Sequence, residues 1–319
     1  MPIVEKKNIS YTPLYNTDFG QAFNGDSLEV MQSIPDNSIN LILTSPPFAL
    51  TRQKEYGNKL EQYYIDWFMQ FSKHFYRLLT KDGSLVIDLG GAYLPGHPTR
   101  SIYQYELLVR LCREQNFFLA QEFFHYNPAR LPAPAEWVNV RRIRVKDSVN
   151  IVWWLSKIEN PKADNRKVLK PYSDSMKALL KNGYKAQLRP SGHDISNKFS
   201  NDNGGAIPPN LLEIANTESN SYYMKRCKEL GIKPHPARFP KDFADFFIKF
   251  ITDENDVVLD PFAGSNTTGY AAELLQRKWI AIEINESYLQ GSKIRFEEEP
   301  NLFNPEPKIN GKAQKIRPA

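Results

Sequence analysis

The sequence predicts an α/β protein built on a mostly parallel, doubly wound sheet, and three observations indicate this fold. Short apolar runs typical of buried parallel strands alternate with longer stretches of helical periodicity. Turn-forming or glycine-containing sequence follows these runs, and open α/β sheets bind ligands at such positions. A polar region rich in Asn, Ser, Gly, Pro and Lys interrupts the alternation, so we expect an insertion into the sheet domain.

The alternation can be followed element by element along the chain. Strand character is shared by six short runs: 39–44, 84–89, 122–125, 149–155, 257–260 and 280–284. All except 122–125 have the continuous apolar composition of strands buried on both faces, and we expect these five to be parallel. Helical periodicity covers 63–79, between the first two strands, and 243–252, before the strand at 257–260.

Size and composition are those of an ordinary globular protein. The 319 residues suffice for one large domain or two modest ones, and 41% are apolar and 24% charged. No apolar run approaches the about 20 residues that span a bilayer, and residues 1–10 lack the apolar stretch of a secretory signal. We therefore expect a cytoplasmic protein without a membrane partner.

The two cysteines and the basic residues narrow the class further. Cys112 and Cys227 stand outside any Cys-x-x-Cys arrangement, which indicates a reducing compartment and no zinc site. The net charge of +5 is concentrated in two clusters: Arg141, Arg142, Arg144 and Lys146, and Lys225, Arg226 and Lys228. Clustered cations suit phosphate groups, although a solvated basic face gives the same pattern.

A turn after the strand at 257–260 is the predicted cofactor site. It has the sequence Asp260-Pro261-Phe262-Ala263-Gly264-Ser265-Asn266-Thr267, and Gly264 allows the backbone to approach a ligand closely. The turn lacks both the dinucleotide fingerprint and the Gly-Lys-Ser/Thr of a phosphate loop, so we expect a ligand without a pyrophosphate. Glu283 ends the next strand and could hold two ribose hydroxyls. A plain strand-to-helix connection would also explain such a turn.

A second turn, Ser45-Pro46-Pro47-Phe48, follows the strand at 39–44 and is the predicted catalytic motif. Two prolines remove two amide donors, which leaves the Ser45 hydroxyl and the Pro46 carbonyl as hydrogen-bond acceptors. Two such acceptors suit one kind of substrate, an exocyclic base amine, which is a weak nucleophile. If they held the two hydrogens of the amine, its lone pair would be aimed at a methyl group. Phe48 could stack on the base. A diproline turn is otherwise ordinary punctuation between elements.

Asp88 is the candidate for the proton that the methylated amine must lose. It ends the strand at 84–89, which should neighbour the strand that leads to Ser45. A serine hydroxyl is a poor proton acceptor, so we expect Asp88 to hydrogen-bond Ser45 and to stabilise or relay the proton. A helix-capping or loop role is the alternative for this acid.

The order Ser-Pro-Pro-Phe resembles the catalytic motif of DNA methyltransferases that modify exocyclic amines, and the serine version resembles the N4-cytosine enzymes. The turn at 260–264 resembles the cofactor motif of the same family, and 235–240 resembles the segment beneath the methionine moiety. Because the catalytic motif precedes the cofactor motif, the order is that of the permuted, beta class. Residues 54–58, 141–147 and 189–194 match one member of this class closely.

The resemblance implies a Rossmann-like, seven-stranded methyltransferase fold that uses S-adenosylmethionine and no metal. It assigns Asp26, in Gly25-Asp26-Ser27, to the adenine amine and Phe239 to the cofactor site. With the turn and Glu283, the expected cofactor-binding residues are Asp26, Phe239, Asp260, Pro261, Phe262, Gly264, Ser265, Asn266, Thr267 and Glu283.

Double-stranded DNA is the implied substrate, and its target base must flip out of the helix to reach a cofactor in a pocket. Tyr126, in Tyr126-Asn127-Pro128, resembles the family's aromatic residue beside the flipped base. Residues 159–233 lie where this class carries its target-recognition region, between catalytic parts at 1–158 and 234–300 and before a tail at 301–319. The expected DNA-binding residues are Tyr126, Arg141, Arg142, Arg144, Arg189, His193 and Lys198.

The family further implies a bacterial restriction-modification system, in which methylation protects host DNA from a cognate endonuclease. N6-adenine methylation stays open because the same grip serves the adenine amine. Methylation of RNA or of a protein glutamine is a more distant alternative, and the large insertion and the permuted motif order weigh against it. C5-cytosine methylation is disfavoured because neither cysteine follows a proline. A catalytically silent DNA-binding subunit is the alternative of another class. The recognition sequence and the oligomeric state cannot be read from the residues.

Overall fold

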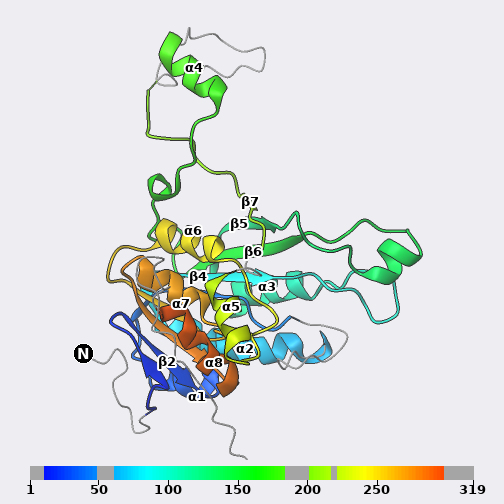
Figure 1. The fold of residues 1–319 in the computed structure, drawn as a ribbon, viewed down its shortest axis with the longest axis vertical. Helices are drawn as coiled ribbons and strands as arrows, with labels where there is room; N and C mark the ends of the chain where they lie inside the picture. The colour runs from blue at the N-terminus through cyan, green and yellow to red at the C-terminus, as the bar shows by residue number, and fades with distance from the viewer. Residues whose placement is uncertain (1–10, 49–60, 184–200, 217–220, 298–319) are drawn as a thin grey trace, which may run out of the picture.

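The computed structural model describes residues 11–48, 61–183, 201–216 and 221–297. Its strands form one nine-stranded sheet with the spatial order β1-β2-β9-β8-β3-β4-β6-β5-β7 (Figure 1). The strands are β1 Tyr15–Asn16, β2 Gly20–Asn24, β3 Ile39–Thr44, β4 Leu79–Leu89, β5 Phe118–Tyr126, β6 Val149–Ser156, β7 Leu211–Glu213, β8 Val257–Asp260 and β9 Lys278–Glu283. Seven strands were expected; the two-residue β1 and the three-residue β7 extend the two edges.

The middle of the sheet is parallel, as predicted. β2 pairs with β9, β9 with β8, β8 with β3 and β3 with β4, each in parallel register. The predicted strands at 39–44 and 257–260 coincide with β3 and β8. Because all five of these strands point the same way, their carboxyl ends meet at one edge, where α/β sheets bind ligands.

The expected direction of the strand at 149–155 was wrong. That run forms β6, which pairs antiparallel with both β4 and β5. Its continuous apolar sequence reports burial on both faces, and Trp153 and Leu155 are indeed fully buried, but burial carries no information on strand direction. β5 and β6 are consecutive strands, and antiparallel neighbours need no helical crossover between them.

Helices cover both faces of the sheet. The α-helices are α1 Ser27–Gln32, α2 Glu61–Leu78, α3 Tyr103–Glu114, α4 Asp174–Asn182, α5 Tyr222–Glu229, α6 Lys241–Ile251, α7 Thr267–Leu274 and α8 Glu286–Ser292. One apolar cluster joins α1, α2 and α3 to one face, and a second joins α6, α7 and α8 to the other. Alternation along β3 explains the two clusters, since Ile42 faces the first and Leu41 and Leu43 face the second.

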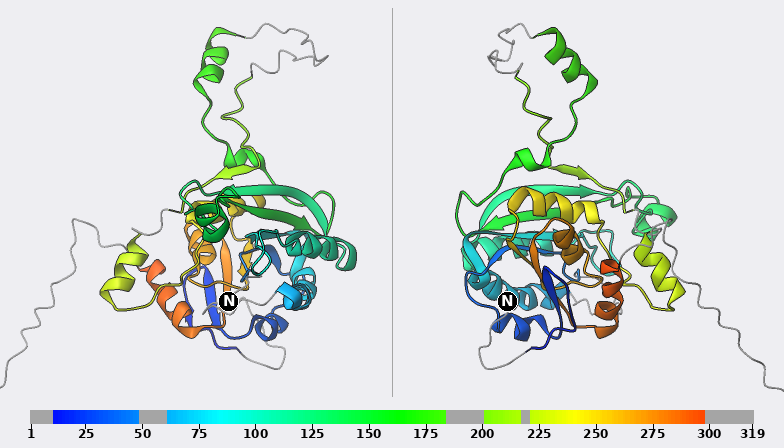
Figure 2. Two further views of the ribbon diagram at one scale, coloured as in Figure 1. Left: turned by 90° about the vertical axis from the view of Figure 1, so that its right-hand side faces the viewer. Right: turned by 60° about the vertical axis from the view of Figure 1, so that its left-hand side comes forward.

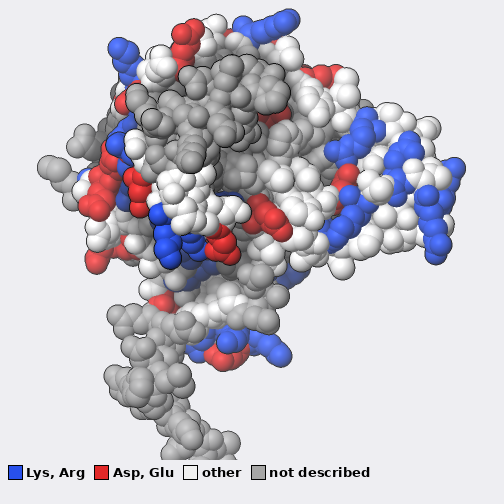
Figure 3. Space-filling model, turned by 90° about the horizontal axis from the view of Figure 1, so that it is seen from above, with Lys and Arg blue, Asp and Glu red and all other residues white. Residues whose placement is uncertain are grey.

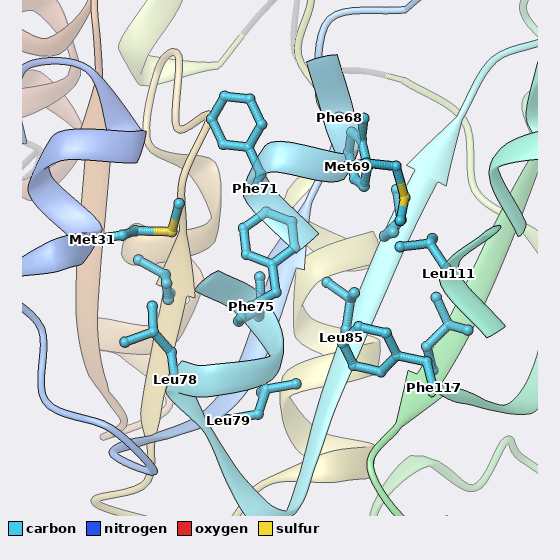
Figure 4. Close-up of a cluster of buried hydrophobic side chains, with 14 of the residues drawn as sticks. Met31, Phe68, Met69, Phe71, Phe75, Leu78, Leu79, Leu85, Leu111 and Phe117 are labelled. Atoms are coloured by element: carbon cyan, nitrogen blue, oxygen red, sulfur yellow. The ribbon is translucent and has the colours of Figure 1, made fainter. Parts of the chain in front are cut away.

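The first cluster shows why α2 forms where it does. Its apolar side chains recur at helical spacing, so that Phe68, Phe71 and Phe75 all belong to the first cluster (Figure 4). Phe68 and Phe75 are fully buried, and each such side chain contributes about 1.5–3 kcal/mol of hydrophobic stabilisation. This packing fixes the helix beside the carboxyl ends of β3 and β4.

Two parts of the chain extend away from the layered body. The first carries α4, which lies far from the sheet in each ribbon view (Figures 1 and 2). The second, between β5 and β6, contains the short π-helix η1 Glu136–Val140. Lys and Arg side chains gather on the projection at the right of Figure 3, the side to which the η1 segment extends in Figure 1.

Within the described residues, no helix is long and apolar enough to cross a membrane.

Candidate active site

A cavity of about 620 Å³ opens at the carboxyl ends of the parallel strands. Its walls come from the turns after β2, β3, β8 and β9, from the end of β4, and from the 235–240 segment. The predicted residues that line it are Asp26, Ser45, Pro46, Pro47, Phe48, Asp88, Phe239, Pro261, Phe262, Gly264, Ser265, Thr267 and Glu283. The sheet thus brings the two predicted turns, more than 200 positions apart in sequence, into one site.

Asp260 holds the turn after β8 from beneath. Its fully buried carboxylate accepts hydrogen bonds from Thr44 Oγ1 at 2.8 Å, Thr268 Oγ1 at 2.7 Å and the Phe262 amide at 3.1 Å. Burial raises the pKa of Asp260 to about 6, and the three donors oppose this shift. Asp260 was expected at the cofactor, but it lies outside the cavity lining and ties β3, β8 and α7 together.

Asn266 has a similar structural position. It adopts a left-handed conformation, with φ of 53°, and caps α7 by accepting a hydrogen bond from the Gly269 amide. Its amide nitrogen donates to the Tyr15 hydroxyl, and the side chain is completely buried. Asn266 therefore shapes the turn from behind the cavity wall that it was expected to form.

Gly264 brings bare backbone into the cavity. Its φ is +52°, and a Cβ there would lie 3.2 Å from the ring of His235. His235 lines the same cavity, and burial lowers its pKa to about 4, so this wall is uncharged at neutral pH. The glycine is required both by the left-handed backbone and by the close approach of this ring.

Glu283 presents a fixed carboxylate at the end of β9. One oxygen accepts the Gly264 amide at 2.8 Å and the other accepts the Asn285 amide at 2.9 Å. Burial raises its pKa, and these two backbone donors counteract the effect. Each carboxylate oxygen can accept a further hydrogen bond, so a diol could be held between them.

Asp26 stands next to Glu283 because β2 and β9 are neighbours. It is the N-cap of α1, and its side chain accepts the Leu28 amide at 2.8 Å. The adjacent Ser27 hydroxyl donates to the Pro261 carbonyl, which joins this helix to the turn after β8. Asp26 keeps acceptor capacity toward the cavity that it lines.

Ser45 and Asp88 lie side by side at the ends of β3 and β4. The Ser45 hydroxyl is 3.4 Å from Asp88 Oδ2 and 3.3 Å from the Asp88 carbonyl oxygen. These contacts are long compared with usual hydroxyl hydrogen bonds, which have donor-acceptor distances of about 2.7 Å. The predicted adjacency of the two strands is confirmed by their parallel pairing, and the proton relay stays a prediction.

Two further polar residues face Asp88 and were missed from the sequence. Asn150 Nδ2 donates to Asp88 Oδ2 at 3.2 Å. His125 Nδ1 lies 3.9 Å from Asp88 Oδ1, and neither of these buried atoms has a hydrogen-bond partner among the described residues. Asn150 lies on β6 and His125 on β5, two antiparallel strands. Only the sheet order, in which β6 lies between β4 and β5, brings both residues to Asp88.

Aromatic rings form the wall next to Ser45. Phe48 packs so closely on Gly90 that a Cβ at that glycine would lie 2.5 Å from its ring. Trp67 and Phe71, on successive turns of α2, contact the ring of Phe262 at centroid distances of 5.7 and 4.9 Å. All four of these rings line the cavity, and the i, i+4 spacing on α2 was the available sequence signal for Trp67 and Phe71.

Tyr126, expected beside the flipped base, is not among the residues of the cavity wall. It stands on β5 between His125 and Asn127, which do line the cavity. The role of Tyr126 beside a flipped base stays a prediction.

The expected DNA contacts divide between the projection and the undescribed part of the chain. Arg141, Arg142 and Arg144 are exposed on the η1 projection, where Arg141 stacks on Trp137 at 5.2 Å. Arg189, His193 and Lys198 lie outside the described residues.

Comparison with known proteins identifies what this arrangement resembles. A family model described as DNA methylase matches residues 39–294. The chain is 54% identical over 292 residues to the type II methyltransferase M.PvuII of Proteus hauseri, covering 91% of this chain and 87% of that protein. It is 26% identical to M.BglII of Bacillus subtilis over 90% of this chain and 71% of that protein.

Solved structures agree with these relatives. The PvuII DNA methyltransferase, described as cytosine-N4-specific, superposes with a TM-score of 0.75 and 46% identity, covering 92% of this chain and 91% of that one. The Thermus thermophilus protein TTHA0409, complexed with S-adenosyl-L-methionine, shares the fold, with a TM-score of 0.53 and 20% identity over 86% of this chain and 92% of its own. This PvuII enzyme is the family member that was matched closely in the sequence by residues 54–58, 141–147 and 189–194.

Proposed function

This chain belongs to the DNA methylase family, and we propose that it transfers a methyl group from S-adenosylmethionine to the N4 amine of a flipped cytosine in double-stranded DNA. One observation carries this proposal. The Ser45-Pro46-Pro47-Phe48 turn and the Gly264 turn open into the same cavity, on the ends of neighbouring strands β3 and β8. The high identity to a cytosine-N4-specific enzyme supports the choice of base.

The residues at the ends of β2, β8 and β9 fit S-adenosylmethionine. Its ribose diol suits the carboxylate of Glu283, which backbone amides hold in place, and its adenine amine suits the free acceptor capacity of Asp26. The bare backbone at Gly264 leaves room for a ligand where a side chain would reach His235. When bound, the cofactor supplies an electrophilic methyl group.

The residues at the ends of β3 and β4 would prepare the amine. The Ser45 hydroxyl and the Pro46 carbonyl can accept its two hydrogens, which favours a tetrahedral nitrogen with an available lone pair. As the nitrogen gains positive charge, Asp88 stabilises it through Ser45 and takes up the released proton. Phe48 offers a face on which the base can stack.

DNA would approach across the projection and the extended region. The exposed Arg141, Arg142 and Arg144 suit phosphates, and residues 159–233 act as the target-recognition region in this proposal. Part of that region is tied to the catalytic body, because β7 joins the sheet beside β5. Replacing each arginine by glutamine should weaken binding and reduce the salt dependence of log K by about one per lost phosphate contact.

In its biological setting, we propose that the protein works in the bacterial cytoplasm within a restriction-modification system. Methylation would protect host DNA from a cognate endonuclease, which need not bind this chain. The two thiols, neither of which forms a disulfide, are consistent with a reducing compartment.

The decisive experiment uses unmethylated DNA and methyl-labelled S-adenosylmethionine. After incubation with the protein, the DNA is digested to nucleosides and the labelled species is identified by mass spectrometry. We expect labelled N4-methylcytosine. Labelled N6-methyladenine would keep the mechanism and overturn the base, and unlabelled DNA would favour a binding-only protein.

A further inference from the structure

A chain of polar contacts runs from the catalytic aspartate toward the surface. Asp88 accepts a hydrogen bond from Asn150 Nδ2 at 3.2 Å, and Asn150 Oδ1 accepts one from Arg130 Nη1 at 3.0 Å. Asp88 is 3% exposed, whereas Asn150 and Arg130 are half-buried, and all three line the cavity. The contacts therefore lead from the floor of the site outward.

The side-chain amide of Asn150 can make both of these hydrogen bonds in only one orientation. Its nitrogen faces the carboxylate and its oxygen faces the guanidinium, because a carboxylate only accepts and a guanidinium only donates. Two consecutive hydrogen bonds therefore join Arg130 to Asp88 Oδ2, the same oxygen that faces the Ser45 hydroxyl.

The guanidinium of Arg130 has N–H donors that are not used within the described residues. A guanidinium carries five N–H groups, and within the described residues this one donates to Asn150 and forms no ion pair. Arg100 differs, since it forms an ion pair with Asp147. A cation that lines a cavity without a carboxylate partner is suited to an anion that arrives with a ligand.

The backbone around Arg130 is fixed to the basic projection. Lys146 Nζ donates to the carbonyl oxygens of Pro128 and Arg130, at 3.1 and 3.2 Å. Arg130 N also closes a turn onto the Asn127 carbonyl oxygen at 3.2 Å. The backbone of Arg130 is thus held against the segment proposed to contact DNA, while its side chain lines the cavity.

We propose that Arg130 binds a phosphate flanking the flipped nucleotide and, through Asn150, positions Asp88 for the reaction. The inference rests on the proposed function, because base flipping draws a nucleotide and its phosphates toward the cavity. A guanidinium can grip a phosphate with two parallel hydrogen bonds while a third holds Asn150. Phosphate binding and the alignment of Asp88 with Ser45 then occur together, so a correctly placed strand completes the site.

The test compares Arg130→Gln, Arg130→Lys, Asn150→Ala and the double variant Arg130→Gln/Asn150→Ala with the wild type. Arg113→Gln is the matched control, since it removes the same charge from an exposed position on α3 outside the cavity. The probe is an unmethylated duplex with one site that the wild-type protein binds in preference to bulk DNA. Two quantities are measured: the dependence of log K on log salt, and the single-turnover rate with saturating S-adenosylmethionine.

For the phosphate contact, Arg130→Gln should reduce the salt slope by about 0.9, and Arg130→Lys and Arg113→Gln should leave it unchanged. For the link to Asp88, Asn150→Ala should keep the slope and slow single turnover by about 10- to 100-fold. The double variant should be no slower than the slower single variant, because both interrupt one chain.

An unchanged slope in Arg130→Gln would overturn the phosphate contact, and rate losses that multiply in the double variant would overturn the link. If Arg130→Gln does not fold, Arg130→Lys carries the test, because it keeps the charge but lacks the planar guanidinium: its single-turnover rate should fall while its salt slope is kept, and a wild-type rate would overturn the link. Failure of the proposed function is distinguishable, because it appears in the nucleosides labelled by the wild type. The salt slope is measured by binding alone and is independent of the base that is labelled.

Discussion

The two halves of the cavity differ in how completely their polar groups are satisfied. In the half formed by β2, β8 and β9, Glu283 accepts from two backbone amides at 2.8 and 2.9 Å. Behind the wall of this half, Asp260 accepts from three donors at 2.7 to 3.1 Å, one of which is Thr44 on β3. In the half formed by β3 and β4, Ser45 is 3.3 to 3.4 Å from Asp88, and Asp88 Oδ1 lacks a hydrogen-bond partner among the described residues. The carboxylates of the first half are therefore well paired within the protein, whereas the carboxylate of Asp88 is paired only in part.

This difference indicates that the two halves are prepared at different times. Buried polar groups are costly when unpaired, so carboxylates as well paired as those of Asp260 and Glu283 are already fixed in position before a ligand binds. Around Asp88 the contacts are longer and Oδ1 lacks a hydrogen-bond partner among the described residues, so this half can still adjust when an amine binds to Ser45 and Pro46. Cofactor binding should therefore depend little on the catalytic half, whereas catalysis should depend on both.

The largest effect should come from Asp88→Asn, which sharpens this contrast. We expect methyl transfer to fall by about 10²- to 10⁴-fold because the amide cannot take up the proton. The dissociation constant of S-adenosylmethionine should stay within about twofold of the wild type, since the cofactor half is complete without Asp88. Single-turnover rates and equilibrium binding of labelled cofactor measure the two quantities.

Asp82→Asn is the control for this variant, because Asp82 lies on the same strand at its exposed end. Near-normal turnover of Asp88→Asn would end the relay hypothesis. A large loss of cofactor affinity would break the separation between the two halves.

Glu283→Gln should produce the next largest effect, in the opposite half. The amide keeps one acceptor but loses the charge that two backbone amides and a diol share, so we expect cofactor affinity to fall by roughly 10- to 100-fold. Glu286→Gln, three residues later on exposed α8, is the control. Titration calorimetry measures the affinity, and a wild-type value for Glu283→Gln would remove the ribose assignment.

Gly264→Ala tests whether the cofactor half is rigid. The left-handed backbone should cost about 1–2 kcal/mol of unfolding free energy, and the added Cβ must also displace His235. Gly96→Ala is the matched control, since Gly96 has a φ of +73° with nothing within 4 Å of the added Cβ. Urea unfolding should show a loss in both variants, and only Gly264→Ala should weaken cofactor binding. Weakened binding in both would show that strain alone is responsible.

The smallest effect is a pH dependence of stability. Burial lowers the pKa of His235 to about 4, so the folded chain keeps this ring neutral where the unfolded chain, with a pKa near 6.5, takes up a proton. Stability from His235 is therefore complete above about pH 6.5 and is lost as pH falls toward 4. The contribution of Asp260 to stability has the opposite pH dependence. Because its pKa is raised, stability falls as pH rises from about 4 to about 6.

The two groups are separated by comparing the wild type with His235→Gln in urea at several pH values. The variant should lose less stability than the wild type on acidification from pH 6.5 to 4. Parallel curves would mean that the buried ring does not contribute.

The sequence predicted the parallel strands and the turns that follow them because both are local properties. Continuous apolar runs report burial, and Pro and Gly report turns, so 39–44, 257–260 and the residues after them could be identified without tertiary information. The family resemblance supplied the cofactor and the base, and the comparisons agree with it.

The residues that meet across the sheet could not be predicted from the sequence. His125 and Asn150 carry no local signal, since each lies within an ordinary strand, and Arg130 lies in a short turn. Their meeting with Asp88 depends on β6 lying between β4 and β5 and running antiparallel to both. Asp260 and Asn266 show the converse, because their motif is recognisable but only burial reveals that they support the turn from behind.

By itself, the sequence determined which segments could bind a ligand, because turns, caps and apolar runs are set by neighbouring residues. Only the tertiary structure decided which polar atoms face the cavity and which remain without partners. Strand order and strand direction bring together residues far apart in the chain, and hydrogen bonding depends on distances of a few tenths of an ångström. The chemistry of Asp88 is set at that scale, by Ser45, Asn150 and His125.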